Sequence, residues 1–373
     1  MKILQLGKFY PIRGGVEKVM FDLMVHLSGK NIYCDMLCAS EDTGNADEAI
    51  IINPFSTIYI TKTYKEIAKT KISPSIVMKL RGICHKYDII HIHHPDPMVA
   101  LALYLSGYKG KVVLHWHSDI LAQKKLLKFY EPLQKWIIKR ADVIIGTSVN
   151  YLKNSQALIP FKNKCLAVPI GIEDIFEKNK NIQIKEAKKY DGKKVIFSLG
   201  RLVSYKGFEY LIDSALHLND DYVILIGGSG PLKNILQKRI QDQGLNNKVK
   251  LLGYLSDEDV LQYYSLCDIF CLSSIEKTEA FGIVQIEAMC FSKPVIATKI
   301  EGSGVSWVNK DGITGINVEV RNSKQIANAI KKITFDLDYY RKTSLASRNR
   351  FVSMFTIERM SESILNIYDD LYD

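Results

Sequence analysis

Short apolar runs alternate with helical patterns along the first half of the chain. The strand-like runs lie at Lys2–Leu6, Ile32–Cys38, Ile89–Ile92, Val112–Trp116 and Val143–Thr147, with helices expected between them at Val16–Ser28 and Leu126–Arg140. Buried strands joined by helices are typical of a parallel sheet that is covered on both faces. The pattern therefore predicts an α/β domain of the doubly wound kind.

A second series of the same kind begins after the turn-rich stretch 168–173. Its strands are expected at Lys194–Leu199, Tyr222–Ile226, Val249–Leu252, Ile269–Leu272 and Pro294–Thr298, with helices at Phe208–His217 and Leu232–Gln243. At 373 residues the chain exceeds what one hydrophobic core usually organises. We therefore expect two Rossmann-like domains, 1–170 and 174–354, with a hinge near Ile170–Asp174.

The last amphipathic stretch, Ile357–Leu371, carries apolar residues near helical spacing. We expect a C-terminal helix, about 355–373, that packs back on the N-terminal domain.

Composition favours an ordinary soluble globular protein, with 47% apolar and 24% charged residues. No segment approaches the roughly 18 consecutive apolar residues of a membrane span, and the start is too short in apolar residues for a signal peptide. We expect a cytoplasmic protein. Its seven cysteines are scattered and odd in number, which is typical of small core residues rather than of disulfides or a zinc site.

The positive charge is concentrated between Thr61 and Arg140, where 15 Lys and Arg stand against five acids. This excess equals the net charge of the whole chain, +10. Aromatic and aliphatic residues such as Phe129 and Trp136 interrupt the lysines. Such a surface suits the anionic membrane face or a lipid pyrophosphate, while a solvated helix face is the plain alternative. No nucleic-acid partner is expected, because no binding motif accompanies the charge.

Two carboxylates, Glu279 and Glu287, flank a predicted strand-to-helix turn at Phe281–Gly282. A helix start offers unpaired N–H groups and a partial positive charge, and flanking carboxylates can bind sugar or ribose hydroxyls. Glu287 lies within an apolar helix, where an acid needs a partner or a function; the alternative is a solvated surface for both.

Cations follow the first strand of the second domain, where Arg201 and Lys206 precede Gly207 at a helix start. Together they could neutralise a leaving diphosphate. The next strand ends in a loop with Gly228 and Gly230, which lacks the third glycine and the acid of a dinucleotide fingerprint, so NAD binding is disfavoured.

In the first domain, Gly14–Gly15 precedes a helix and would let the backbone approach a phosphate or sugar, although Gly-Gly is often a plain turn. Five histidines gather at two neighbouring strand ends; they are His91, His93, His94, His115 and His117. A metal site is one alternative, but the usual spacing is absent. We expect no metal, and we expect His117 to hydrogen-bond the reacting sugar.

These motifs together resemble glycosyltransferase family 4, the retaining nucleotide-sugar transferases of the GT-B fold. The resemblance rests on GGVEKV near the start, HWHSD at His115–Asp119, GRLVSYKG at Gly200–Gly207, GSGP at Gly228–Pro231 and EAFGIVQIEAM at Glu279–Met289. It spans essentially the full length and is similar to the branch that builds bacterial surface polysaccharides such as O-antigen. It implies two Rossmann-like domains facing a central cleft, with the acceptor on the N-terminal side and the nucleotide sugar on the C-terminal side.

The resemblance also implies roles for individual residues. Arg201 and Lys206 would hold the donor diphosphate, Glu287 the ribose, and Glu279 the donor sugar, with Glu276 as a further candidate for that contact. His117 would bind the sugar near its anomeric carbon. The phosphate cradle would be completed by the backbone of Gly14, Gly15, Gly230, Phe281, Gly282 and Ile283, and the nucleobase would be flanked by Gly253, Tyr254 and Leu255.

The expected reaction moves a hexose-type sugar to a lipid-linked saccharide without metal or cofactor, the departing phosphate helping to deprotonate the acceptor. Positive charge at Arg201 and Lys206 would stabilise the leaving diphosphate. A sugar-nucleotide epimerase of the same fold, and a basic membrane-surface module without activity, are the alternatives.

Overall fold

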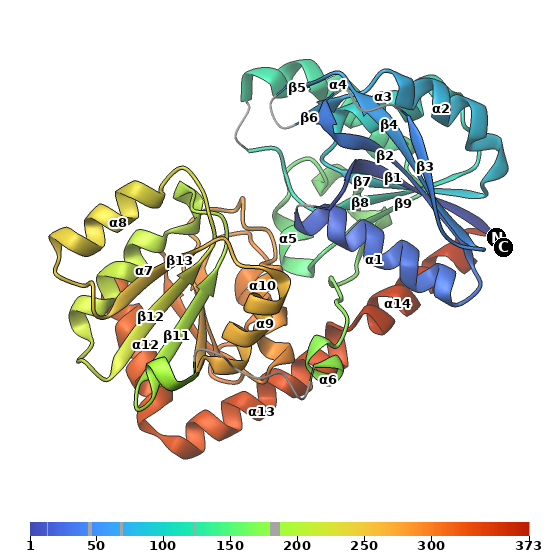
Figure 1. Cartoon of the computed structure of the whole chain (residues 1–373). Helices are drawn as coiled ribbons and strands as arrows, with labels where there is room; N and C mark the ends of the chain where they lie inside the picture. Colours follow the sequence, from blue (N-terminus) through green and yellow to red (C-terminus); the bar gives the residue numbers. More distant parts are fainter. Residues whose placement is uncertain (13, 44–46, 68–69, 122–123, 180–186, 373) are drawn as a thin grey trace. The chain divides into compact units, whose positions relative to one another are not determined.

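The computed structural model describes residues 1–12, 14–43, 47–67, 70–121, 124–179 and 187–372 (Figure 1). The side chains of residues 124–127 and 187 also lie outside the description, as does Lys69 of the basic stretch. Within these residues the chain divides into two compact units. The first unit comprises Met1–Ile172 and Ile357–Asp373, and the second comprises Glu173–Thr356. The division falls inside the stretch where sequence placed the hinge.

The first unit is built on an eight-stranded sheet in the order β10-β9-β8-β7-β1-β2-β4-β3. Its strands are β1 (Lys2–Tyr10), β2 (Tyr33–Thr43), β3 (Glu48–Asn53), β4 (Ser56–Thr63), β7 (Ile89–His94), β8 (Lys111–Trp116), β9 (Val143–Gly146) and β10 (Cys165–Ala167). The prediction of a fully parallel sheet is wrong at one edge, because β3 pairs with β4 in antiparallel fashion. A separate hairpin joins β5 (Lys65–Ile67) to β6 (Thr70–Ile72).

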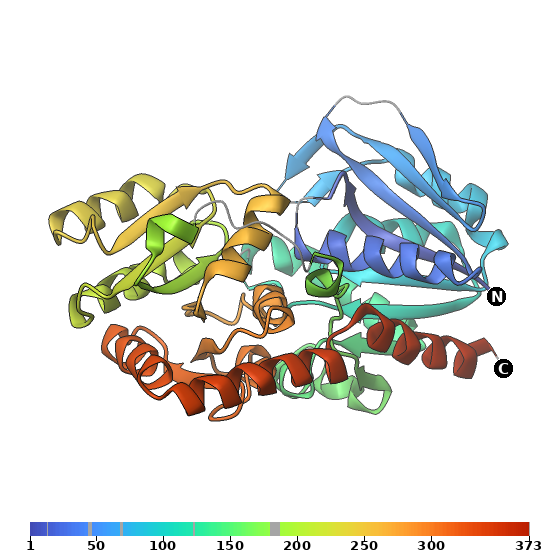
Figure 2. The same ribbon diagram turned by 60° about the horizontal axis from the view of Figure 1, so that its bottom comes forward.

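Helices cover this sheet. They are α1 (Gly15–Gly29), α2 (Ser75–Ile83), α3 (Pro97–Ser106), α4 (Lys124–Arg140), α5 (Val149–Asn154) and α14 (Ile357–Tyr372). Figures 1 and 2 show α1 running along one face of the sheet, where it contacts both β1 and α14. The apolar stripe of α14, including Met360 and Ile364, is buried, so the C-terminal helix contributes to the core of the first unit.

The second unit contains a six-stranded, fully parallel sheet in the order β13-β12-β11-β14-β15-β16. Its strands are β11 (Lys194–Leu199), β12 (Tyr222–Gly227), β13 (Val249–Gly253), β14 (Ile269–Leu272), β15 (Val295–Lys299) and β16 (Gly315–Glu319). The helices are α6 (Ile175–Lys178), α7 (Phe208–Ser214), α8 (Lys233–Asp242), α9 (Asp257–Leu266), α10 (Ile283–Cys290), α11 (Val305–Val308), α12 (Ser323–Phe335) and α13 (Leu337–Met354). Both units are therefore Rossmann-like, and the predicted fold class is confirmed.

Both faces of the second sheet are buried, which explains why its central strands are mainly apolar. On one face Ile196, Ile224 and Ile269 pack with residues of α7, α8 and α12. On the other, the Phe197 and Phe270 rings lie within 5.4 and 5.7 Å of the Tyr264 ring of α9. The side chains that remain available for chemistry are thus those at the strand ends.

Candidate active site

The second unit holds Lys206 beside Glu279 at the carboxyl edge of its sheet. Lys206 ends a single 3-10 turn after β11, and Gly207 follows it with φ of 61°. A Cβ at Gly207 would collide with the carbonyl oxygen of Ser273, so this left-handed close approach requires glycine. The Lys206 ammonium lies 2.6 Å from Glu279 Oε2, and the two side chains are only 10% and 12% exposed.

Lys206 keeps its charge despite being buried. Burial by itself lowers the pKa of Lys206, but the Glu279 carboxylate outweighs that effect and raises the pKa above its ordinary value. Glu279 Oε2 also accepts a hydrogen bond of 2.9 Å from Ser274 Oγ. Lys206 is therefore a fixed cation whose ammonium has three N–H donors, one of which serves Glu279.

Arg201 lies in the loop between β11 and this turn. Its side chain is exposed, and its charge is close enough to Lys206 to oppose protonation of that lysine. Two like charges near one another at a strand edge are costly unless an anion binds between or beside them. The structure therefore places the two predicted cations near each other.

The loops after β12 and β13 extend the same edge. The backbone N–H of Leu202 donates to Ser229 O at 2.9 Å, which holds the Gly230 loop against the Arg201 loop. Gly253 ends β13 with φ of 77°, and its carbonyl accepts from the Gly228 N–H at 2.7 Å. Tyr254 beyond it is 78% exposed.

Leu255, the third residue predicted beside the nucleobase, packs on the end of β12, because a Cβ at Gly227 would meet its side chain. The structure thus gathers Gly230, Gly253 and Leu255 on neighbouring strand ends and leaves the Tyr254 ring free in solvent.

The turn into α10 carries the remaining predicted residues of this unit. Gly282 precedes the helix with φ of 77°, Ile283 begins it, and Phe281 is buried before it. One turn further on, Glu287 is half-buried and accepts a hydrogen bond of 2.7 Å from the Tyr264 hydroxyl. The partner that sequence required for this acid is therefore Tyr264, whose pKa is raised by burial and by the same carboxylate.

Glu276, the further candidate for the sugar contact, is exposed. Its backbone carbonyl accepts from the Glu279 N–H at 2.9 Å, so it shapes the loop that presents Glu279. Within the described residues its carboxylate makes no hydrogen bond.

The first unit places Gly14 and Gly15 at the start of α1, as the sequence indicated. The space above Gly14 is already occupied, because a Cβ there would collide with Oε2 of Glu17. Glu17 is 7% exposed, and burial raises the pKa of its carboxyl against the opposing charge of Lys8. Sequence analysis missed Glu17 as a residue that lies over the predicted cradle.

Lys8 is a second residue that sequence analysis missed. It follows Gly7 near the end of β1 with φ of 54°, a conformation rare for a residue with a side chain. Its N–H donates to Asp96 Oδ2 at 2.8 Å, and its charge acts on Glu17, His93 and His117. The positive φ of Lys8 and its bond to Asp96 mark it as a candidate site residue. Neither feature can be deduced from the sequence alone.

The five histidines cluster as predicted, on β7 and at the end of β8, with His93 opposite His115 in register. All are buried, and burial lowers their pKa values, to about 3 for His94 and His115. His117 follows β8, and its ring lies 4.0 Å from that of His115. The cluster is therefore a set of neutral imidazoles at neutral pH.

Nitrogen atoms of His91, His93 and His115 lie within 4.8 Å of one another, a spacing that a metal ion could bridge. His93 already uses both ring nitrogens, toward Gln5 Oε1 at 2.8 Å and His117 Nε2 at 2.9 Å. No carboxylate is among the charges that act on these three rings. Both ring nitrogens of His115 and Nε2 of His91 are buried without a hydrogen-bond partner among the described residues, so the absence of a metal stays a prediction.

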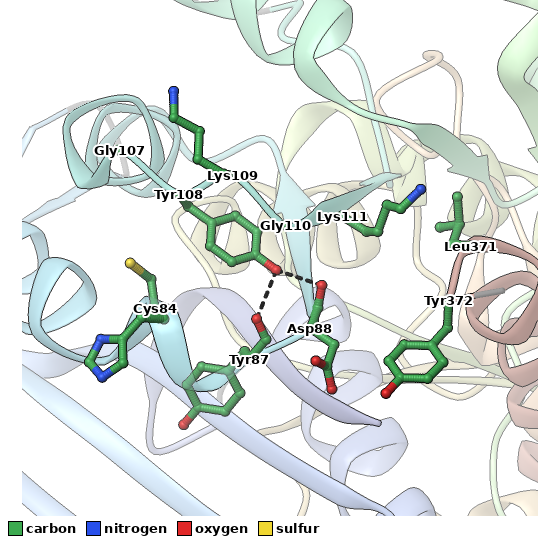
Figure 3. Close-up of a pocket in the computed structure, with 11 residues that line it drawn as sticks. Cys84, Tyr87, Asp88, Gly107, Tyr108, Lys109, Gly110, Lys111, Leu371 and Tyr372 are labelled. Atoms are coloured by element: carbon green, nitrogen blue, oxygen red, sulfur yellow. Dashed lines mark hydrogen bonds between the residues drawn. The ribbon is translucent and has the colours of Figure 1, made fainter.

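A pocket of about 470 Å³ lies at the opposite, amino edge of the first sheet (Figure 3). Asp88 precedes β7 and Gly110 precedes β8, while Leu371 and Tyr372 come from the end of α14. The Tyr108 hydroxyl bonds to the backbone carbonyls of Tyr87 and Asp88 rather than facing a ligand. None of the predicted site residues lines this pocket, and ligands of open parallel sheets bind at the carboxyl edge, so it is not the candidate site.

The sequence profile described as "Glycosyltransferase Family 4" matches residues 13–174, and that described as "Glycosyl transferases group 1" matches residues 179–350. O-antigen chain mannosyltransferase C of Escherichia coli is 30% identical over 100% of this chain and 99% of its own length. D-rhamnosyltransferase WbpZ of Pseudomonas aeruginosa is 29% identical over 85% of this chain and 82% of its own.

A crystal structure of Anabaena Alr3699/HepE in complex with UDP and glucose has a TM-score of 0.78 at 20% identity and covers 99% of both chains. At that identity the likeness shows the fold, which is GT-B. The evidence for the activity is the sequence matches, whose names are those of glycosyltransferases. They support neither the epimerase nor the inactive module. The chain therefore belongs to glycosyltransferase family 4 and is a hexosyltransferase.

Proposed function

We propose that this protein transfers a hexose-type sugar, with retention, from a nucleoside-diphosphate sugar to a lipid-linked saccharide in surface-polysaccharide or O-antigen assembly. The proposal needs no metal and no cofactor. The carboxyl edge of the second sheet would bind the donor, and the first unit would bind the acceptor.

The observation that carries the proposal is the buried Lys206 ammonium held at 2.6 Å from Glu279. As the bond between sugar and diphosphate breaks, negative charge grows on the diphosphate. Lys206 and Arg201 would stabilise that charge, and the N–H groups at the start of α10 would add a fixed dipole. A positioned cation in a site with little water is worth several kcal/mol, because the screening is weak.

Glu279 supports the choice of a retaining path. Its Oε2 is engaged by both Lys206 and Ser274, and Oε1 makes no hydrogen bond with the described residues. A carboxylate held this way is suited to accept from a sugar hydroxyl rather than to attack carbon. Attack of the acceptor on the face that the diphosphate leaves, with a phosphate oxygen taking the acceptor proton, needs no protein nucleophile and retains configuration.

A surface on α2, α3 and α4 supports peripheral contact with an anionic membrane. Its exposed apolar side chains are Met78, Leu101, Tyr104, Leu105 and Phe129, with exposed fractions from 37% to 85%. Its exposed cations are Arg81, Lys86, Lys109, Lys128, Lys135 and Lys139. Contacts of α3 with both α2 and α4, and the Tyr104–Trp136 ring pair, hold the helices side by side (Figure 1).

Within the described residues, none of the helices combines the length and hydropathy that a membrane span requires. Exposed basic and aromatic side chains on neighbouring helices are instead suited to lying on anionic headgroups, each cation contributing about 1 kcal/mol near the surface. This would bring the acceptor's lipid anchor to the first unit.

The names of the relatives guide the choice of substrates to test. Mannose, as in the E. coli relative's name, is the first donor sugar to try, and both GDP- and UDP-linked hexoses belong in the panel. The acceptor is a synthetic polyprenyl-diphosphate saccharide. Each assay is run both with and without EDTA. Mass spectrometry and NMR of the product would give the added mass and the anomeric configuration.

We expect one hexose added with the configuration of the donor, at a rate that EDTA leaves unchanged. An inverted product would exclude the retaining path, and loss of activity in EDTA would exclude metal independence. If the protein interconverted sugar nucleotides in the absence of acceptor, its activity would be epimerisation and not transfer.

The membrane contact is tested separately, by sedimentation with vesicles that contain phosphatidylglycerol. Lys128→Glu combined with Phe129→Ser should reduce binding about tenfold or more, as two membrane contacts are lost. The matched control is Lys331→Glu with Phe335→Ser, an exposed pair on α12 of the second unit, where Phe335 is 94% exposed. Equal losses in both variants would contradict the assignment of this surface.

A further inference from the structure

A chain of hydrogen bonds crosses the first sheet and ends at His117. Gln5 lies on β1, His93 on β7, and His117 just after β8, and these three strands are neighbours. Gln5 Oε1 is 2.8 Å from His93 Nε2, and His93 Nδ1 is 2.9 Å from His117 Nε2. The two imidazole planes differ by 14°, which suits a bond between in-plane nitrogens.

The position of each proton follows from the first link. An amide oxygen carries no hydrogen, so His93 Nε2 must donate to it. A neutral imidazole has a single N–H, which leaves His93 Nδ1 as an acceptor. His117 Nε2 therefore donates to His93, and His117 Nδ1 is left with a bare lone pair.

Neutral rings are what this environment favours. Gln5 and His93 have no exposed surface, and His117 is 4% exposed. Burial lowers the pKa values of His93 and His117, and the nearby charge of Lys8 lowers them further. A buried imidazolium beside a lysine ammonium would be unpaired, so each ring keeps one proton.

The direction of the chain is set by the amide of Gln5. Its Nε2 lies 3.2 Å from the Tyr368 hydroxyl of α14 and 3.6 Å from Cys34 Sγ. The Tyr368 hydroxyl in turn lies 2.5 Å from His91 Nδ1, to which it can donate. With the amide reversed, every proton in the chain would move and His117 would present an N–H, so Gln5 decides which group His117 offers.

His117 Nδ1 is a buried nitrogen without a hydrogen-bond partner among the described residues. Such an atom costs stability unless a ligand or water satisfies it. A bare nitrogen accepts a hydrogen bond from a hydroxyl and cannot donate to a phosphate oxygen. This distinguishes sugar hydroxyls from the diphosphate of the same donor.

We propose that Gln5 is a positioning residue that acts through His93 to hold His117 in the tautomer with the proton on Nε2, so that Nδ1 accepts a hydroxyl of the donor sugar. The second part rests on the proposed function and on the contact with the donor sugar that the family resemblance implies for His117. The first part concerns the protein alone and is tested without substrate.

The test is long-range ¹H–¹⁵N NMR of the full chain labelled with ¹⁵N-histidine, because protonated and bare ring nitrogens resonate far apart. His117→Asn identifies the His117 signals. The wild-type chain should show a bare Nδ1 and a protonated Nε2 at residue 117. Gln5→Met, which has similar length and no acceptor, should show a mixture of both tautomers.

His93→Phe interrupts the chain at its second link and should produce the same mixture, so the test does not depend on Gln5→Met folding. The matched control is Tyr108→Phe, which removes a buried tyrosine hydroxyl of the same unit that bonds to the carbonyls of Tyr87 and Asp88, away from this chain of hydrogen bonds. It should retain the wild-type tautomer.

The same variants are assayed with the panel of GDP- and UDP-hexoses described above. Gln5→Met and His93→Phe should lower kcat about tenfold, because His117 would then spend part of its time in the wrong tautomer. The effect is expected to be smaller than that of a wrong histidine tautomer in a catalytic triad. Tyr108→Phe should stay within about twofold of wild type. A protonated Nδ1 at His117 in the wild-type chain, or unchanged spectra and rates in Gln5→Met, would overturn the inference. A bare Nδ1 in a chain that uses no donor of the panel would support the role of Gln5 and count against the proposed function.

Discussion

The two units place polar side chains at the carboxyl edge of a sheet in opposite electrical states. The first unit gathers five buried histidines that are neutral at pH 7, with pKa values lowered by burial. The second unit holds a salt bridge between Lys206 and Glu279, whose side chains are 10% and 12% exposed. A buried group can stay uncharged and share protons, or stay charged and take a counter-ion with it.

The difference matches what each edge would bind under the proposed function. A diphosphate leaves with additional negative charge and needs a fixed cation, which a partner carboxylate keeps protonated. Sugar hydroxyls carry no charge and need oriented lone pairs and N–H groups. One fold, repeated twice in the chain, would thus supply a charged surface for the diphosphate and an uncharged one for sugar hydroxyls.

The largest effect should come from acid, which acts on the uncharged edge. A histidine whose pKa is lowered in the folded state takes up its proton only on unfolding, so its stabilising effect is present above pH 6.5 and is lost as the pH falls below it. Each of the five histidines should cost about 1.4 kcal/mol per pH unit in that range. The raised pKa values of Glu17 and Asp96 act in the opposite sense at lower pH but are fewer.

The measurement is urea unfolding at pH 7.5 and 5.5, followed by tryptophan fluorescence. Trp116 and Trp136 report the first unit and Trp307 the second, so Trp307→Phe and the double Trp116→Phe, Trp136→Phe variant separate the two. The second unit, whose single histidine is His217, should change little. Equal losses in both units would contradict the contrast.

Lys206→Ala tests the charged edge and should lower kcat/KM about 1,000-fold, because a preorganised cation is lost. It also leaves Glu279 buried without its partner, which should cost about 3–5 kcal/mol in the free energy of unfolding. Arg239→Ala breaks the Arg239–Asp213 pair elsewhere in the second unit and serves as control. Full activity of Lys206→Ala would refute the role of this lysine.

Glu279→Gln should have a smaller effect, about 100-fold in kcat, since the amide keeps the hydrogen-bonding shape but loses the charge that holds the Lys206 proton. Glu276→Gln changes the exposed neighbour three residues earlier and is expected to stay within about threefold of wild type. A comparable loss in both variants would assign part of the sugar contact to Glu276.

Tyr264→Phe should have the smallest effect. It removes the 2.7 Å hydrogen bond to Glu287, worth about 1.5–3 kcal/mol for a charged acceptor in a dry site, and less here because Glu287 is half-exposed. We expect the donor KM to rise about fivefold with kcat unchanged. Tyr222→Phe, which loses a bond to Thr334 on the same unit, should leave KM alone. An unchanged KM in Tyr264→Phe would argue against a ribose contact at Glu287.

Much of the fold could be predicted from sequence because its strands are buried on both faces. Ile269–Leu272 and Lys194–Leu199 have the predicted bounds, and β1 extends beyond the predicted Lys2–Leu6 as far as Tyr10. The edge strand β3 was missed although it contains the apolar run Ala49–Ile52, because it pairs antiparallel with β4 and so departs from the alternation of strand and helix on which the prediction rested. The local sequence around Lys206 and around Glu279 was also sufficient to select each of them as a candidate site residue. Their roles stay predictions.

What sequence could not provide are contacts between distant positions. Lys206 and Glu279 are 73 residues apart, and Gln5 and His93 are 88 apart. Gln5 looks like one polar residue in an apolar strand, and only the sheet order shows that it faces a histidine. Glu17 was overlooked because a glutamate in the first turn of a helix is common on electrostatic grounds alone.

The bond between Gln5 and Tyr368 joins residues 363 positions apart. During synthesis, the first domain to leave the ribosome must therefore wait for the last helix to be made before its polar interior is complete. The second domain has all of its strands by then and can fold first. The N-terminal domain, although it is made first, would therefore be the last to complete its fold. A chain that ends before α14 should accumulate with a folded second domain and an incompletely folded first domain.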